Sequence, residues 1–331
     1  MERVIGVKMN ANVRINKFDN LKGLAIFLVV LGHFIYFTKT SEITFVHNVV
    51  HIIHLPIFFF VAGYFSKIGP DEPTKAFKRL MVPFIIFCIL YWLFAKFVLL
   101  MNPKTLFIYP GFGLWFLISL FFMKMILPIV DKLKYPVLIS MVAAILSGFV
   151  DCSVLGLSRT FCFLPVFLIG FYYKEYAPLL SGYSFLNRKS TAILIIILTA
   201  ISILCAAKIF PFRVIYFKHH YYSPILFDMI GRIIVILLGM IVALILNQIM
   251  TNRNIILTKF GKNSMSVYIL HLFTVILFQE IMKAFYPNHE LMSMAIVILM
   301  TFIVVFITSR DIVAQTLNGF TDAVFDLFFK S

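Results

Sequence analysis

The chain has 331 residues, of which 62% are hydrophobic and 13% charged, with a formal net charge of +15 and a mean hydropathy of +1.00. This composition excludes a soluble globular domain and is typical of a polytopic membrane protein. The positive charge is weak evidence for nucleic-acid binding, because membrane proteins retain basic residues on their inner side. No nucleic-acid partner is expected.

Apolar runs long enough to cross a bilayer, roughly 20 residues each, recur between residues 21 and 309. We therefore predict an all-α fold, a polytopic membrane helix bundle of about ten transmembrane helices. The expected helices are 21–38, 49–66, 77–100, 112–130, 134–151, 158–174, 190–210, 225–249, 262–283 and 291–309. The predicted parts are an N-terminal segment 1–20, a transmembrane domain 21–309 and a tail 310–331.

Basic residues predict the orientation of the bundle. With the N-terminus inside, 20 of the 29 lysines and arginines fall in inner segments and 7 in outer segments. Because Lys and Arg are retained on the cytoplasmic side, both termini are predicted to be cytoplasmic, in a multi-pass protein of the inner membrane. In the tail, apolar residues recur at helical intervals, which predicts an amphipathic helix on the inner lipid surface. They are Val313, Leu317, Phe320, Val324 and Leu327.

The first predicted helix carries the main candidate for chemistry, His33, within the apolar stretch 24–37. A titratable imidazole in membrane-buried sequence is costly and indicates a function. Lys22 lies eleven positions earlier, about 16 Å along the same helix face, and Gly23 and Gly32 allow a ligand or another helix to come close. The alternative is a lysine at the membrane interface and a histidine satisfied in the core.

Other polar residues are candidates for lining a cavity. Asp19 caps the first helix or pairs with Lys22, and the minority interpretation is that it orients a catalytic group. His47, His51 and His54 share a helix face, but no acidic or cysteine partner motif accompanies them, so we expect polar lining and no metal. The four cysteines show no paired spacing and are predicted to be packing thiols.

Two later helices carry further candidates. Asp228 and Arg232 stand one turn apart and form an internal ion pair, unless Arg232 faces the cavity and contacts a substrate. Tyr268 and His271 share a face and are expected to line the cavity. The outer segment 208–223 mixes cations with aromatic residues, which suits an acceptor sugar or, alternatively, an interfacial aromatic belt.

At these residues the chain resembles the acyltransferase-3 family of integral membrane O-acyltransferases. The resemblance rests on two residues of the first predicted helix, Lys22, which is set in Phe18 to Ala25, and His33. It also rests on His54 to Tyr64, on the basic group Lys75, Lys78 and Arg79 before Pro83, on Leu114 to Leu117 with Trp115, and on Gly261, Ser264, Ser266, Tyr268 and His271. Lysines replace the two arginines that the family usually has in the basic group, and lysine lacks the bidentate fork of arginine.

The resemblance implies acetyl-CoA as acyl donor and a sugar of a cell-surface or lipid-linked glycan as acceptor. Lys22, Lys75, Lys78, Arg79 and Arg14 are then predicted to hold the donor phosphates at the inner face. His33 would act on the acceptor hydroxyl as a general base, or carry the acyl group transiently. The alternative function is a transporter or flippase for a sugar or lipid-linked intermediate, which could use the same intramembrane polar residues.

Overall fold

The computed structural model describes residues 15–35, 41–100, 113–150, 154–181, 224–285 and 290–329, together with residues 107, 217 and 221. Throughout this part of the chain the regular structure is helical. The longer helices are α1 (Asn16–Ile35), α2 (Ser41–Phe65), α4 (Val82–Leu93), α5 (Trp115–Val130), α6 (Pro136–Leu146), α7 (Leu157–Ser181), α10 (Ile225–Ile249), α12 (Ser264–Phe285), α13 (Glu290–Thr308) and α14 (Asp311–Phe328).

The all-α prediction is confirmed, and nine of the ten expected helices have counterparts among the described residues. The range 225–249 matches α10 at both ends, whereas the expected helix 190–210 lies outside the described residues. Five helices of the described part are long and apolar enough to cross a membrane, or up to seven if each bent pair is one span. The predicted spans 112–130 and 134–151 are shorter in the structure, with 16 residues in α5 and 11 in α6.

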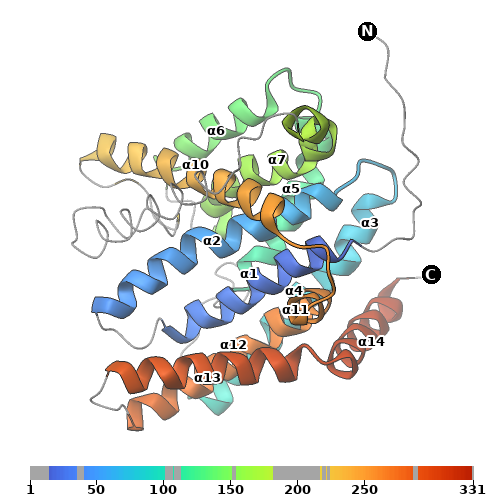
Figure 1. Ribbon diagram of the computed structural model, residues 1–331. Coiled ribbons are helices and arrows are strands. Elements are labelled where there is room, and N and C mark those ends of the chain that lie inside the picture. Colours follow the sequence, from blue (N-terminus) through green and yellow to red (C-terminus); the bar gives the residue numbers. More distant parts are fainter. Residues whose placement is uncertain are drawn as a thin grey trace.

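Helices α1 and α2 lie at the centre of the bundle (Figure 1). Helices α6, α7 and α10 cover one side of this pair, and α11 (Ile256–Lys262), α12 and α13 cover the other. Large apolar side chains fill the space between them, with Phe34, Phe59 and Phe167 completely buried. The central position of α1 and α2 places most of the predicted polar residues inside the protein.

Glycines allow two pairs of helices to pack backbone against backbone. A Cβ at Gly261 of α11 would overlap the carbonyl oxygen of Asp19 in α1, and a Cβ at Gly23 would overlap that of Leu257. Gly63 of α2 and Gly170 of α7 face each other's helix in the same way. Close approach through small residues is the usual means of packing helices in membranes. The expectation that Gly23 admits another helix agrees with this contact.

One end of the bundle gathers many of the basic residues, and we call it the basic end. At this end the start of α1 contacts the end of α2, where Phe18 stacks on Tyr64. The start of α1 also contacts the segment after α10, because Asn20 donates hydrogen bonds to the carbonyls of Thr251 and Arg253. The basic end includes Lys17, Lys22, Lys78, Arg79, Lys124, Lys174, Arg253, Lys259, Lys262 and Arg310.

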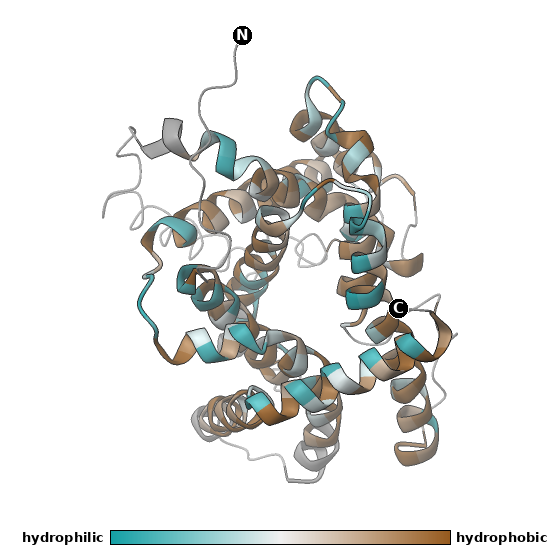
Figure 2. Cartoon of the chain, turned by 90° about the vertical axis from the view of Figure 1, so that its right-hand side faces the viewer, coloured by the Kyte–Doolittle hydropathy of each residue, from teal (hydrophilic) through white to brown (hydrophobic). Residues whose placement is uncertain are grey.

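The tail helix α14 crosses the basic end at an angle of 61° to α13 (Figure 2). The prediction of an amphipathic helix is confirmed in outline, but the packed face differs from the predicted stripe. Leu317 belongs to both, and Ala314, Thr321 and Phe325 complete the buried face. Of the other predicted stripe residues, Val313 and Val324 are partly buried, and Phe320 and Leu327 point outward, 48% and 77% exposed. Packing against the bundle therefore uses a mixed face, and an apolar face is left for contact with lipid.

Candidate active site

Lys22 lies near the start of α1, and its Nζ is 2.9 Å from Oδ1 of Asp19. The lysine side chain keeps 26% of its surface exposed and the aspartate 6%. Asn20, between them, is fully buried and accepts a hydrogen bond of 2.6 Å from the hydroxyl of Thr258. The predicted pair of Asp19 with Lys22 is present, so Lys22 stands at the basic end with a carboxylate partner.

Asn20 supports a stability prediction, because its side chain makes three hydrogen bonds within a buried site. Replacing Asn20 with Ala leaves two carbonyls and the Thr258 hydroxyl without this partner. We expect a loss of about 2–4 kcal/mol of stability, since each buried group left unsatisfied costs roughly 1–3 kcal/mol. Thermal unfolding in nanodiscs measures it, and unchanged unfolding would show that these bonds contribute nothing.

The basic group of Lys75, Lys78 and Arg79 follows α2. Lys75 lies in the short helix α3 (Glu72–Ala76), and Lys78 and Arg79 lie on the π-helical turn Phe77–Met81. Lys75 is exposed, and its Nζ is 3.6 Å from carboxylate oxygens of both Asp71 and Glu72. Arg79 is exposed and has no carboxylate partner among the described residues. Arg14, the remaining predicted donor residue, lies outside the described residues.

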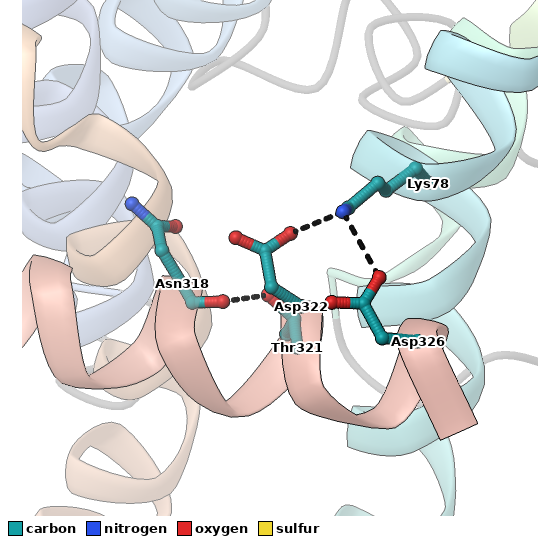
Figure 3. A network of polar contacts seen from close by, with 5 residues as sticks. All are labelled: Lys78, Asn318, Thr321, Asp322 and Asp326. Carbon is teal, nitrogen blue, oxygen red and sulfur yellow. Dashed lines mark hydrogen bonds and ion pairs between the residues drawn. The ribbon is translucent and has the colours of Figure 1, made fainter. Parts of the chain in front are cut away.

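Lys78 is held by two carboxylates of α14 (Figure 3). Its Nζ is 3.1 Å from Oδ1 of Asp322 and 3.5 Å from Oδ1 of Asp326, and it lies over the Phe325 ring at 4.8 Å. A ligand phosphate must therefore compete with two acidic side chains for this cation. Nothing in the linear sequence indicated that the tail would return to the basic group 244 positions earlier.

Lys124 is a cation of the basic end that was not among the predicted donor residues. Its Nζ donates a hydrogen bond of 3.0 Å to the hydroxyl of Ser66, and it interacts electrostatically with Glu72 and Arg79. Its position in the middle of an apolar helix was the available signal. An anion at the basic end would meet Arg79 and Lys124 together.

Deeper in the bundle, five histidines from three helices come together, and we call them the histidine cluster: His33 of α1, His47, His51 and His54 of α2, and His271 of α12. The rings of His33 and His271 meet edge to face with centroids 5.1 Å apart. His47, His51 and His54 follow one another along α2 with ring centroids 4.5 Å and 4.9 Å apart. Their shared face agrees with the predicted spacing.

Exposure distinguishes the members of the histidine cluster. His54 and His271 are almost completely buried, at 2% and 0% exposed, and His47 is 4% exposed. His33 and His51 each keep part of their residue surface exposed, unlike the other three members of the cluster. Partial exposure inside the bundle is what a substrate-reaching histidine requires, because a fully packed ring could not meet an acyl group.

Two cluster histidines are held by backbone carbonyls of the preceding turn. Nδ1 of His271 lies 3.0 Å from the carbonyl oxygen of Val267, and Nδ1 of His54 lies 2.5 Å from that of Val50. Since a carbonyl only accepts, each Nδ1 carries the proton and donates it. Nε2 of His271 is then an acceptor, and it is buried without a hydrogen-bond partner in the described structure.

Aromatic residues and a cation close the site at the start of α5 and α7. The guanidinium of Arg159 lies 4.2 Å from the centre of the Trp115 ring, and the Tyr268 hydroxyl donates to the carbonyl of Gly113. A Cβ at Gly113 would lie 3.9 Å from both Cε1 of His33 and the Tyr268 hydroxyl, so these two side chains approach the same glycine. Tyr268 and His271 therefore lie close to His33, whereas Trp115 contacts Arg159, Phe59 and Phe163.

Arg159 was counted in the sequence only as an outer basic residue. The structure places it near Tyr268 and His51, and His51 also has His33 among its neighbours. The sequence does contain a signal for this residue: a single arginine at the start of a long apolar run. A charge at such a position is costly in a membrane and therefore indicates a function.

Arg232 lies away from this group and stabilises the end of α6. Its Nη1 donates to the carbonyl of Ala144 at 3.2 Å and to the hydroxyl of Ser147 at 3.0 Å, and the guanidinium lies over the Tyr221 ring at 4.7 Å. These contacts neutralise carbonyls at a helix C-terminus. Tyr221, from the predicted acceptor segment, donates to the carbonyl of Ile145 and is itself buried.

Cys88 and Cys162 are free, buried thiols, while Cys152 and Cys205 lie outside the described residues. In the described ranges no group of three or more His, Cys, Asp or Glu side chains is arranged to hold a metal ion.

An all-helical bundle of apolar spans with a polar, partly accessible interior defines a multi-pass membrane protein. The acyltransferase domain of the acyltransferase-3 family matches residues 15–310. The chain belongs to this family and is a membrane acyltransferase, which confirms the resemblance seen in its motifs. No curated protein matches the chain, and no solved structure matches it.

Proposed function

We propose that this acyltransferase moves an acetyl group from cytosolic acetyl-CoA to a sugar hydroxyl of a cell-surface or lipid-linked glycan, with His33 as its reactive residue. The observation that carries the proposal is the partly exposed imidazole of His33 beside His271, inside a bundle whose family transfers acyl groups. The basic end supplies cations for the anionic part of the donor, on what we take to be the cytoplasmic side of the inner membrane.

His33 acts as a general base in the simplest mechanism. Its imidazole takes the proton of the acceptor hydroxyl while the oxygen attacks the thioester carbonyl, the carbon–sulfur bond breaks, and the proton passes to the leaving thiolate. Alternatively, His33 attacks the thioester itself and the hydroxyl then attacks the acyl-imidazole. Both routes release CoA and form an acetyl ester. His271 packs against the His33 ring and helps to keep it in place.

The separation between the two parts of the site suits a long donor. Lys22 and His33 are eleven residues apart on α1, which corresponds to about 16 Å along the helix. Phosphates bound by Lys22, Lys78 and Arg79 at the basic end leave the pantetheine arm to carry the acyl group inward. The arm is thin and flexible, so it can reach a residue inside a helix bundle.

Purified protein in nanodiscs, supplied with labelled acetyl-CoA, tests the proposed reaction. We expect release of CoA and transfer of label to glycan from the native membrane, and NMR of surface glycans should show O-acetyl groups that a deletion strain lacks. Movement of a glycan or lipid-linked sugar across the bilayer without consumption of acetyl-CoA would overturn the proposal in favour of transport.

The contacts of Lys78 lead to a prediction about donor affinity. Replacing both Asp322 and Asp326 with Asn removes the carboxylates that compete with phosphate, so we expect the KM for acetyl-CoA to fall about two- to fivefold, the effect of an exposed ion pair. Lys78→Gln should raise it. Steady-state kinetics at low salt measure both, because salt screens exposed charges.

Asn318→Ala on the same helix is the matched control, since Asn318 does not contact Lys78 (Figure 3). It should leave the KM unchanged. An unchanged KM in the double Asp variant would show that Lys78 does not bind the donor.

A further inference from the structure

Arg159 has a position that the transfer mechanism above does not use. It is the third residue of α7, is partly exposed, and rests on the face of Trp115 at 4.2 Å. A guanidinium over an indole is held in place by cation–π attraction, which fixes the group but does not neutralise its charge. The five N–H donors at the edge of the guanidinium plane remain available to a planar acceptor.

No acidic side chain pairs with Arg159 in the described part of the chain. Three lysines of the inner basic groups, Lys22, Lys75 and Lys78, do have carboxylate partners. Inside a membrane bundle an unpaired charge is costly and is retained for function. The missing counterion is therefore expected to arrive with a substrate.

Unpartnered polar atoms occur next to this cation and in the histidine cluster. The Ser158 hydroxyl is 3% exposed and has no hydrogen-bond partner within the described residues, and neither does Nε2 of His271. Buried groups of this kind are normally satisfied. Arg159 rests on Trp115, two positions after Gly113, and a Cβ at Gly113 would lie 3.9 Å from Cε1 of His33, so the guanidinium lies at the His33 end of this part of the bundle.

The position of Arg159 separates it from the donor phosphates. Along α7, Lys174 lies at the basic end over the Tyr64 ring, and its separation of fifteen positions from Arg159 corresponds to about 22 Å of helix. A CoA whose phosphates occupy the basic end presents only its neutral arm and thioester near His33. The anion that meets Arg159 must then come from the acceptor.

We propose that Arg159 binds an anionic group, a carboxylate or a phosphate, carried by the acceptor sugar, so that the enzyme selects acidic acceptors. This assignment rests on the proposed function. Arg159 acts as a specificity residue: a bidentate contact to the anion sets the sugar so that a neighbouring hydroxyl meets His33. The stacked guanidinium suits this task better than a lysine, because its fork is already oriented.

Binding of simple sugars to the full-length protein in nanodiscs tests the proposal. The probes are glucuronate, glucose 6-phosphate and neutral glucose. Binding of each probe is measured as the shift that it causes in the thermal unfolding temperature of the protein. We expect the first, the second or both to stabilise the wild-type protein, and glucose to have no effect. Arg159→Gln should weaken binding of the acidic sugar about tenfold or more, and Arg159→Lys should weaken it less.

Two controls make the result specific. The first control is Arg310→Gln. Arg310 also lies over an aromatic ring, at 5.6 Å from the centre of Phe306, but it belongs to the basic end. Its replacement should leave binding of acidic sugars unchanged. Coenzyme A should stabilise the wild-type and Arg159→Gln proteins equally. His33→Ala should still bind acidic sugars, which separates this proposal from the failure of acyl transfer.

Equal stabilisation by glucose and the acidic sugars, or no stabilisation by any of them, would overturn the assignment to the acceptor. Loss of CoA binding in Arg159→Gln would also overturn it, because the anion would then belong to the donor.

Discussion

His33→Ala protein is expected to lose acyl transfer almost completely while keeping its fold. Removing a general base typically costs a factor of about 10² to 10⁴ in rate, and loss of an acyl-carrying residue costs at least as much. His33 is partly exposed and contacts His271 through ring packing, so its truncation leaves the bundle intact. The measurement is the rate of CoA release from acetyl-CoA in the presence of native acceptor membranes.

His33→Gln is the matched control for shape, since it keeps a polar side chain of similar size but cannot take up a proton at neutral pH. It should be as inactive as His33→Ala and unfold at the wild-type temperature. Wild-type rates in either variant would exclude His33 as the reactive residue. Inactivity accompanied by a large loss of stability would instead assign it a structural role.

Gly261→Val is expected to cause the largest loss of stability. A side chain at this position collides with the backbone of α1 at Asp19, and backbone cannot move aside as a flexible side chain can. We expect a loss of about 3 kcal/mol or more, at the upper end of overpacking effects, and an unfolding temperature lower by roughly 5–10 °C. The displaced helix also carries Asp19 and Lys22 out of position, so donor binding should weaken.

Gly319→Ala provides the comparison, because Gly319 lies in α14 and a Cβ there would meet no atom within 4 Å. Alanine favours a helix over glycine by about 1 kcal/mol, so this variant should be neutral or slightly more stable. Thermal unfolding of both proteins in the same lipid decides the matter. Equal behaviour of the two variants would show that α1 and α11 are not in close contact.

The helices were largely predictable because each one coincides with an apolar run in the sequence. For α10 the predicted range agrees with the structure at both ends. The breaks were less visible. The stretch from Ile256 to Phe285 bends by 82° between α11 and α12, at a point where Asn263 donates to the carbonyl of Ser309 and to Asp311. That bend depends on partners about 46 residues away in the chain, which no local pattern contains.

The candidate site was predictable in its parts and not in its assembly. Helical spacing indicated the common face of the α2 histidines, but the contact of His33 with His271 joins helices at opposite ends of the sequence. Arg159 was missed because it counted toward the charge balance of the loops. The ion pairs of Lys78 with Asp322 and Asp326 were not predicted, because a tail helix on the membrane surface was expected to contact only lipid.

A structure of the protein with a non-hydrolysable thioether analogue of acetyl-CoA is the most direct measurement. The proposed mechanism predicts the phosphates at the basic end, near Lys22 and Arg79. It places the acyl carbonyl carbon within about 3.5 Å of a ring nitrogen of His33 if that nitrogen attacks the thioester, or one hydroxyl oxygen away from the ring if His33 is the general base. An analogue whose acyl group lies outside the bundle, or against residues remote from His33, would contradict it.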